Sequence, residues 1–360
     1  MISFMKNIKS GILAFALLFS TVAFAGNEDR AGEAGASELL INPWAGSSGW
    51  GGANTANAQG IEAMNLNVAG LAYTKNTSIR FANASYLSGT GIKINTIGFA
   101  QKVGSSEGVL GVSIMSMGFG EIDVTTVDNP DGGLGTFKPN YLNIGLAYSK
   151  KFSNTISGGL VVKMVNQSIA NVSATGVAVD AGVNYVTGKR KQLKFGIALR
   201  NVGPTAKYSG SGLSDRYEEP SSGKNLTISQ RSNEFELPSL VNIGLSYDFY
   251  LARDVDAEEE ELSDHRLTLA GNFTSNSFTK DQIRFGAEYA FKEMFMVRGG
   301  YIYESKVMDE EAAKTAARGL TFGATISYPI SESTNIGIDY SYQTTRVFGG
   351  TNIIGIHLDF

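Results

Sequence analysis

The sequence predicts an all-β protein, a 14-stranded antiparallel transmembrane β-barrel, and three observations support this fold class. First, strand-like segments in which every second residue is apolar follow one another with no helical pattern between them. Second, apolar runs beyond the amino terminus are too broken for membrane helices, whereas membrane strands need only alternate apolar residues. Third, charged residues make up only 18% of the chain, and 43 glycines, 15 tyrosines and 20 phenylalanines suit a curved sheet with aromatic rings at the membrane interfaces.

Residues 1–25 have the pattern of a signal peptide. Lys6 and Lys9 precede a short apolar run, and the run ends at Ala23-Phe24-Ala25, a small-x-small cleavage pattern. The alternative, an amino-terminal membrane anchor, is disfavoured because the run is shorter than the roughly 20 residues that span a bilayer. We therefore expect a mature protein that begins at Gly26.

Residues 26–75 do not alternate and are rich in Gly, Ala and Asn, with a short helix expected over 58–64. Small residues let backbone pass close to backbone, which predicts a plug-like or hatch-like segment folded into the barrel mouth. Trp44 and Trp50 are candidate mouth or ligand contacts. They also argue against the alternative, a flexible periplasmic tail, because disordered segments are poor in aromatic residues.

The barrel itself is expected over residues 76–360, in fourteen segments of alternating character. An even number of strands is what a closed antiparallel barrel with both termini on one side requires. The expected strands are 76–87, 91–103, 106–119, 137–151, 155–169, 171–187, 191–203, 234–249, 264–276, 280–291, 294–304, 317–329, 333–344 and 349–360.

Loop lengths offer a separate test of this strand assignment. If both termini are periplasmic, connections after odd-numbered strands face outward, where outer-membrane barrels carry their long loops. Residues 120–136, 203–233 and 305–316 are long and all follow odd-numbered strands. The acidic connection 251–263 is the exception, because it is long and follows an even-numbered strand.

Alternation also assigns faces, with the apolar set Leu142, Ile144, Leu146 and Tyr148 expected to face lipid. The opposite, lumen-facing set contains charges that either line a polar channel or pair with one another across the interior, and pairing is the favoured interpretation. These residues are Lys194, Arg200, Asp180, Asp248, Arg284, Glu288, Arg298, Asp339 and His357.

The last segment, 352–360, is the expected closing strand, which pairs with the first strand near Ile79 and Phe81 and leaves no edge exposed to lipid. Its terminal Phe360 resembles the carboxyl-terminal assembly signal that the barrel assembly machinery receives. A soluble β-sandwich would show the same alternation. The signal peptide, the uninterrupted run of strands, the loop asymmetry and the aromatic terminus favour the barrel.

Several chemistries are disfavoured by the sequence. The chain has no cysteine, which excludes disulfides and thiolate sites, and its net charge of -4 without a basic block gives no support to nucleic-acid binding. His357 and Asp359 lie two apart on one strand and could form a base with its orienting carboxylate, but no serine lies in a nucleophile elbow. The acidic run 254–261 lacks the glycine of a calcium loop. We expect no enzyme activity, metal site or cofactor.

Short elements in a shared order resemble the PorV/PorQ-type outer-membrane proteins, distant relatives of the FadL-type fatty-acid transporters. The clearest is a hatch-like motif, Asn67, Ala69, Gly70 and Leu71, in which Val68 replaces the usual proline. Others are Gly49 with Gly51-Gly52-Ala53, Leu199-Arg200-Asn201-Val202-Gly203-Pro204, Arg298-Gly299-Gly300-Tyr301 and Asp339-Tyr340-Ser341-Tyr342.

The resemblance implies a FadL-like barrel in the outer membrane of a Gram-negative-type bacterium, in contact with outer-membrane lipid and lipopolysaccharide. It also implies two roles. PorV-like members are accessories of type IX secretion or surface attachment and dock cargo or translocon proteins, here through extracellular loops. FadL-like members pass small hydrophobic molecules, which is the alternative function.

Overall fold

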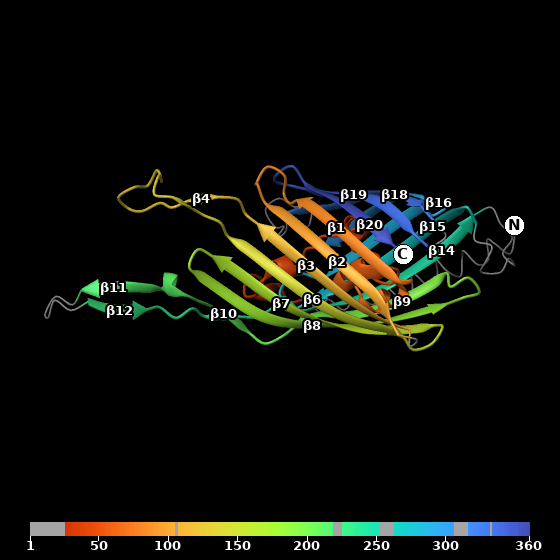
Figure 1. The fold of residues 1–360 in the computed structure, drawn as a ribbon, viewed down its shortest axis with the longest axis horizontal. Coiled ribbons are helices and arrows are strands. Elements are labelled where there is room, and N and C mark those ends of the chain that lie inside the picture. Colours follow the sequence, from red (N-terminus) through yellow and green to blue (C-terminus); the bar gives the residue numbers. More distant parts are fainter. Residues whose placement is uncertain (1–25, 105–106, 219–224, 252–262, 306–315, 332) are drawn as a thin grey trace.

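The structure is a computed structural model that describes residues 26–104, 107–218, 225–251, 263–305, 316–331 and 333–360, so the predicted signal peptide lies outside the described residues. Fourteen antiparallel strands form one closed barrel (Figure 1), which confirms the predicted fold class. The barrel strands are β1 (Thr77–Ser85), β2 (Lys93–Val103), β3 (Gly108–Gly118), β6 (Asn140–Lys151), β7 (Ile156–Ile169), β8 (Val172–Thr187), β9 (Leu193–Val202), β14 (Leu240–Leu251), β15 (His265–Asn276), β16 (Gln282–Phe291), β17 (Phe295–Glu304), β18 (Ala317–Pro329), β19 (Asn335–Thr345) and β20 (Thr351–Asp359).

The barrel closes between its first and last strands. Ile79 pairs with Leu358 and Phe81 pairs with Ile356, so the seam lies where the sequence predicts it. Beyond the last strand, the backbone N–H of Phe360 donates to the Thr77 carbonyl at 2.8 Å. The seam therefore leaves no open sheet edge between β1 and β20.

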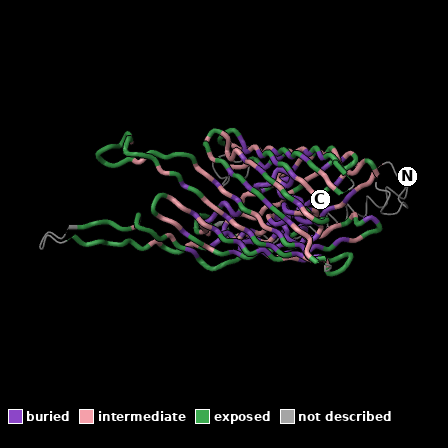
Figure 2. The backbone as a smooth tube through the Cα atoms, in the orientation of Figure 1, coloured by how far each residue is buried: buried purple, intermediate pink, exposed green. Residues whose placement is uncertain are grey.

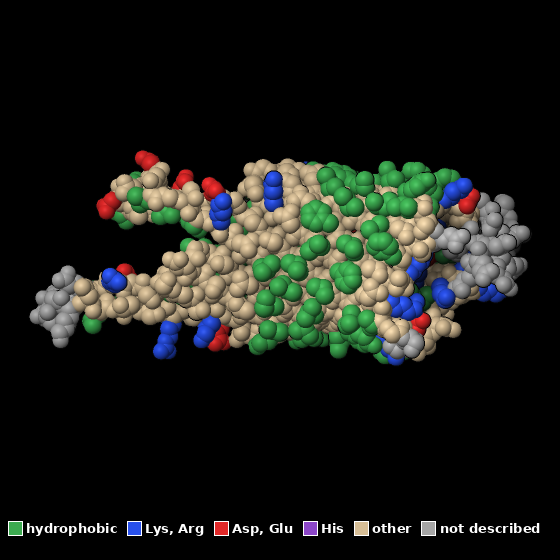
Figure 3. Space-filling view, viewed as in Figure 1, with side chains coloured by type: hydrophobic (Ala, Val, Ile, Leu, Met, Phe, Trp, Pro, Cys, Tyr) green, Lys and Arg blue, Asp and Glu red, His purple; other side chains and the backbone are tan. Residues whose placement is uncertain are grey.

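The outer face of the barrel is apolar. Along β6, Leu146 and Tyr148 are exposed whereas Asn143, Gly145 and Ala147 are buried, as the alternation predicts. Ile326 and Ile338, on β18 and β19, are 59% and 58% exposed to the outside. Figure 3 shows hydrophobic side chains gathered in a belt across the visible face of the barrel, with few charges among them. Such a belt is typical of strands that face lipid.

Residues 26–74, which we call the plug segment, lie inside the barrel (Figure 1). The segment starts beside the β15–β16 turn, where the backbone N–H of Gly26 donates to Asp281 at 2.8 Å, and ends at the opposite mouth, where it leads into β1. It consists of short turns: η1 (Glu28–Arg30), η2 (Ser37–Leu40), α2 (Ala45–Ser48), η3 (Gly60–Asn65) and η4 (Val68–Tyr73). Among the described residues, no helix is both long and apolar enough to cross a membrane.

Inward-facing glycines of the wall make room for the plug segment. A Cβ added at Gly286 would lie 2.8 Å from the Trp50 ring, and one at Gly111 would lie 2.9 Å from Leu71. These contacts explain why an apolar residue followed by glycine recurs along the strands. We call the set the glycine girdle; it comprises Gly98, Gly111, Gly145, Gly182, Gly196, Gly244, Gly286, Gly300, Gly323 and Gly355.

The apolar core lies between the plug segment and the first half of the wall. Trp44, Ile61 and Leu71 of the plug segment pack with Ile94 and Val109 of β2 and β3, and all five are almost fully buried. The second half of the wall meets the plug segment mainly through polar groups, described below. The plug segment is therefore held by apolar packing on one side and by hydrogen bonds and ion pairs on the other.

Long connections extend from one end of the barrel (Figure 1). Gly26 lies at this end, because its N–H donates to Asp281 in the β15–β16 turn. Residues 119–139 carry the small hairpin β4 (Ile122–Asp123) and β5 (Thr136–Phe137). Residues 203–239 carry β10 (Ala206–Ser209), η5 (Ser211–Leu213), β11 (Ser214–Glu218), β12 (Asn225–Ser229) and β13 (Glu234–Phe235). Both follow odd-numbered barrel strands, as the loop test requires. Most of the connections 251–263 and 305–316 lie outside the described residues.

Candidate functional site

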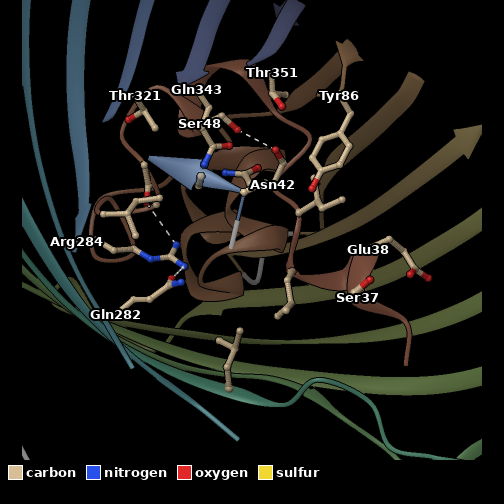
Figure 4. Close-up of a pocket in the computed structure, with 18 of the residues that line it drawn as sticks. Ser37, Glu38, Asn42, Ser48, Tyr86, Gln282, Arg284, Thr321, Gln343 and Thr351 are labelled. Atoms are coloured by element: carbon tan, nitrogen blue, oxygen red, sulfur yellow. Dashed lines mark hydrogen bonds between the residues drawn. The ribbon is translucent and has the colours of Figure 1, made fainter. Parts of the chain in front are cut away.

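A cavity of about 570 Å³ lies at the long-loop end of the barrel, between the plug segment and the surrounding strands (Figure 4). We call it the mouth cavity. One wall is largely apolar and aromatic and contains Tyr86, Met117, Phe119 and Tyr141. The rings of Phe119 and Tyr141 meet edge to face, with centroids 4.8 Å apart. This wall can bind the apolar part of a ligand.

The wall formed by β16 and β17 is polar. Nη2 of Arg284 donates to Oε1 of Gln282 at 2.6 Å, and Nε2 of Gln282 donates to Oε2 of Glu304 at 2.7 Å. Nη1 of Arg284 points at the carbonyl of Gly51 in the plug segment, at 3.5 Å. Figure 4 shows Arg284 and Gln282 side by side, with the guanidinium directed toward the plug segment. The cavity thus has apolar and polar walls.

Glu38 lies at a third side of the cavity and is 2% exposed. Its Oε2 accepts a hydrogen bond from Nε2 of Gln167 at 2.8 Å, and Tyr208 donates to the amide oxygen of the same glutamine. Its Oε1 has no hydrogen-bond partner among the described residues. Burial raises the pKa of Glu38, since a charged carboxylate loses hydration there, although the bond from Gln167 opposes the shift.

Apart from Arg284, the charges that the sequence places on the inner wall are paired, as the favoured interpretation of the sequence expects. Nζ of Lys194 lies 2.7 Å from Asp248, and Nε of Arg298 lies 2.9 Å from Glu288. Asp180 lies within reach of two cations, Lys163 at 2.5 Å and Arg200 at 3.8 Å. Paired buried charges stabilise one arrangement of the wall and make a poor open channel lining.

The partner of His357 differs from the one considered on sequence. Its Nδ1 lies 2.8 Å from Oδ2 of Asp339, whereas Asp359 lies 4.0 Å from Arg80. The reason is the register of β19 and β20, in which His357 faces Gly337, so its ring occupies the space above that glycine and reaches Asp339 diagonally. The pair is buried in the wall and is accounted for as a structural hydrogen bond.

Polar side chains of β1, β17 and β18 also hold the plug segment. Nη1 of Arg80 lies 2.6 Å from Oε1 of Glu62, and Nη1 of Arg298 donates to the Gly46 carbonyl at 2.6 Å. The Thr321 hydroxyl donates to the Gly49 carbonyl at 3.0 Å. The bonds from Arg298 and Thr321 give hydrogen-bond partners to backbone carbonyls of the plug segment, whose short turns cannot pair all of their own.

The residues of the hatch-like motif lie deep in the barrel, away from the mouth cavity. The Asn67 side chain accepts from the backbone N–H of Ala69 at 3.2 Å and donates to the Val183 carbonyl of β8 at 3.1 Å. Gly70 passes so close to the Ala58 carbonyl that any side chain would clash, and Leu71 is fully buried. The motif fixes the plug segment against the wall.

Trp44 and Trp50 are also buried in contacts between the plug segment and the wall. Trp44 lies with Ile61 over Gly98, and the Trp50 ring and backbone lie over Gly286 and Gly300. Neither ring is among the described residues that line the mouth cavity. The two rings can pack against the wall at these positions because the girdle glycines have no side chains to occupy the space.

The cavity-lining aromatic residues and Glu38 were not identified from the sequence. Tyr86, Phe119 and Tyr141 lie at or just beyond strand ends, and only the shared end of β1, β3 and β6 brings them together. The available signal was the aromatic residues at the strand ends that border the outward-facing connections, namely the ends of the first and third barrel strands and the start of the fourth. Among the described residues, no group of three or more His, Asp or Glu side chains is arranged to hold a metal ion.

No family model matches the sequence, and no curated protein matches it. Solved structures do match. The monoaromatic hydrocarbon channel CymD is 14% identical, with 89% of this chain and 98% of that chain covered at a TM-score of 0.50. The Pseudomonas putida toluene transporter TodX is 11% identical, with 87% and 97% covered at a TM-score of 0.52.

At these identities the likeness establishes the fold. The narrower PorV/PorQ assignment and a link to type IX secretion receive no support from these matches. The chain therefore shares the fourteen-stranded barrel of CymD and TodX, which is the fold that the resemblance to the FadL-like superfamily implies.

Proposed function

We propose that this chain is an outer-membrane channel that binds small hydrophobic molecules in its mouth cavity and conducts them across the barrel. The observation that carries the proposal is the mouth cavity itself, an aromatic-walled space of about 570 Å³ above a plugged lumen. Cavities of about 300–1,000 Å³ with apolar walls and a few polar groups are typical of small-molecule sites.

The membrane location rests on the outer face of the barrel. Large apolar side chains such as Leu146, Ile326 and Ile338 are more than half exposed. Covering each such side chain is worth about 1.5–3 kcal/mol, and a closed barrel satisfies its backbone without water. The signal-peptide pattern favours the outer membrane. The two neighbours of the same fold are, by their titles, a hydrocarbon channel and a toluene transporter, which supports the proposed class of cargo.

Conduction requires the plug segment to move. It contacts the girdle glycines of strands on every side of the barrel, at distances that leave no room for a methyl group at Gly244, Gly286 or Gly323. We therefore expect a ligand to leave the mouth cavity only when part of the plug segment shifts from the wall. The polar half of the wall, where hydrogen bonds can exchange with water, is the side we expect to open.

A disulfide that locks the plug segment tests the proposal. The chain has no cysteine, and a Cβ at Gly355 would lie 3.3 Å from that of Ala45, close to the spacing of a disulfide. In cells that lack the gene, A45C/G355C should restore uptake of radiolabelled toluene only after reduction. Each single variant should restore uptake with or without reductant. Equal uptake with and without the wild-type protein would refute the proposal.

Protein docking, the main functional expectation from the sequence, is our second candidate because two hairpins project beyond the barrel (Figure 2). The β11–β12 hairpin places Tyr217, Leu226 and Ile228 on one exposed face, and the β4–β5 excursion exposes Val127 and Leu134. Replacing residues 214–229 by a short Gly-Ser turn should abolish recovery of partner proteins in a pulldown from solubilised membranes. Unchanged recovery, or recovery of the barrel alone from wild type, would dismiss this candidate.

A further inference from the structure

The short-turn end of the barrel, which is the periplasmic end in outer-membrane barrels, carries an uneven distribution of charge. The turns after β2, β6 and β8 follow one another along the sheet, and residues 102–108, 150–156 and 187–193 hold six cations but one acidic residue, Glu107. Figure 3 shows Lys and Arg side chains gathered beside the hydrophobic belt at this end. We call the six cations the basic rim; they are Lys102, Lys150, Lys151, Lys189, Arg190 and Lys191.

Cations elsewhere at the same end lie close to carboxylates. Nε of Arg266 lies 2.6 Å from Oε1 of Glu293, and Nζ of Lys292 lies 4.0 Å from Oδ2 of Asp264. In the basic rim, the one acidic residue lies 3.0 Å from Nζ of Lys102. The three turns of the basic rim therefore carry a net positive charge, which attracts anions to this part of the membrane edge.

Within the basic rim, Lys150 is the cation best placed to meet a partner from outside. The cations of the β8–β9 turn are engaged in other interactions, and Lys151 has its Nζ 4.8 Å from the centre of the Tyr73 ring. Lys150 has neither a hydrogen bond nor an ion pair with any residue that the structure describes. Its ammonium is thus open to an external anion.

Lys150 lies on the lipid-facing side of β6, at the edge of the apolar belt. Tyr148, two residues earlier on the same face, is exposed, whereas Ser149 faces inward and donates to a plug carbonyl at 3.2 Å. In the sheet register Lys150 pairs with Gly108 of β3 on one side and with Gly158 of β7 on the other. Neither neighbouring strand therefore places a side chain of its own beside the lysine stem.

Two aromatic side chains instead cover these glycines. A Cβ at Gly108 would lie 2.8 Å from the Tyr148 hydroxyl, and one at Gly158 would lie 2.9 Å from the Phe152 ring. Tyr148 is 45% exposed and Phe152 is 68% exposed. Lys150 therefore lies between two exposed aromatic side chains at the level where the belt ends. Aromatic rings at this level are typical of the membrane interface, where lipid phosphates lie.

We propose that the basic rim binds an anionic glycerophospholipid of the periplasmic leaflet, with the lipid phosphate on Lys150 and the upper acyl chains against Tyr148 and Phe152. The net positive charge favours an anionic headgroup over a zwitterionic one, which brings its own ammonium group. The continuity of the site with the apolar belt favours a lipid over free phosphate. This inference uses the membrane location stated under the proposed function, and neither its cargo nor its conduction.

Because the chain has no cysteine, a single cysteine can carry a fluorophore at each of two turns. Asn154→Cys labels the β6–β7 turn beside Lys150, and Ile330→Cys labels the β18–β19 turn across the barrel. In phosphatidylcholine nanodiscs, quenching is titrated with nitroxide-labelled phosphatidylglycerol or nitroxide-labelled phosphatidylcholine. At position 154, phosphatidylglycerol should quench at an about fivefold lower fraction, the usual effect of one lysine at a membrane surface. At position 330 the two lipids should quench equally.

Lys150→Gln should remove the preference at position 154, and Lys150→Arg should retain it. Lys292→Gln is the matched control, because it removes a cation at the same end that lies near a carboxylate, and it should change nothing. Heat-modifiable migration on gels verifies that each variant is a folded barrel. Equal quenching by the two lipids at position 154, with no effect of Lys150→Gln, would overturn the inference and leave the proposed channel intact. Loss of the preference on addition of inorganic phosphate at constant ionic strength would also overturn it, in favour of a soluble-anion site. A wild-type protein that does not enter nanodiscs would refute the membrane location itself.

Discussion

Gly300 and Gly299, adjacent on β17, provide a direct test of how closely the plug segment fits the wall. Gly300 faces inward, and a Cβ there would collide with the backbone of Trp50 and lie 2.6 Å from the Thr321 hydroxyl. Gly299 faces outward, and its nearest neighbour would be the Thr321 carbonyl at 3.8 Å, an ordinary contact. The two glycine-to-alanine variants differ in little except the plug contact.

Gly300→Ala should destabilise the packed state by about 1–3 kcal/mol, the usual cost of one extra methyl group in a filled core. Backbone atoms of Trp50 cannot swing aside as a flexible side chain could. Gly299→Ala should be neutral or stabilising by about 0.5–1 kcal/mol, because alanine loses less conformational entropy than glycine in a strand. A change of 1–3 kcal/mol raises the population of displaced plug by about 5-fold to 150-fold.

Hydrogen exchange over residues 44–56, measured in nanodiscs and read by mass spectrometry, reports displacement of this part of the plug segment. We expect faster exchange in Gly300→Ala than in wild type, and unchanged exchange in Gly299→Ala. Conductance in planar bilayers should rise only in the first variant. If both variants exchange and conduct alike, the girdle does not hold the plug segment, and the reasoning from glycine contacts is refuted.

Three further predictions concern other parts of the chain. Arg298→Met removes one of the two cations beside Glu288, which keeps Arg266 at 3.1 Å, and also removes the bond to the Gly46 carbonyl. Denaturant titration should therefore show a loss of about 1.5–3 kcal/mol, the scale of a hydrogen bond to a charged group, and an unchanged stability would contradict the assigned contacts. Burial raises the pKa of Glu38 above its usual 4.5. Glu38 therefore stabilises the folded protein fully below pH 4.5, where it is protonated, and this stabilisation is lost as the pH rises through the raised pKa. Glu38→Gln should therefore flatten the decline of unfolding temperature with rising pH above about 4.5, and an unchanged decline would contradict the assignment. Deletion of Phe360 should impair membrane insertion, measured as heat-modifiable barrel in outer-membrane fractions, and normal insertion would count against its role as an assembly signal.

The barrel could be predicted from the sequence because a strand's periodicity is local. In Leu142 to Tyr148 the apolar residues alternate with small or polar ones, and that pattern alone fixes which face is turned outward. All fourteen predicted segments overlap barrel strands, with ends shifted by a few residues. The path of the plug segment could not be predicted in the same way, since its short turns are stabilised mainly by the wall around them.

The hydrogen-bond and ion-pair partners that lie on different strands also could not be predicted from the sequence. His357 lies nearest to Asp339 only because β19 and β20 pair in one register, and a shift by two residues would give it another neighbour. Likewise, Arg284 and Arg298 lie in the same alternating context. Arg298 faces the carboxylate of Glu288, whereas Arg284 faces the mouth cavity. Which inner-wall cation is left without an acidic partner depends on strand register and on the course of the plug segment.

The glycine girdle links the sequence repeat to the way the protein assembles. The plug segment enters at one mouth and leaves at the other to become β1, so it passes through the whole barrel. Trp44 and Trp50 pack tightly over the girdle glycines: a Cβ at Gly98 would lie 3.1 Å from the Trp44 ring, and one at Gly286 would lie 2.8 Å from the Trp50 ring. Threading the segment through a finished barrel would require these rings to pass the girdle. Closing β20 onto β1 around a segment already in place avoids this step, so we expect the seam at Phe81 and Ile356 to form last.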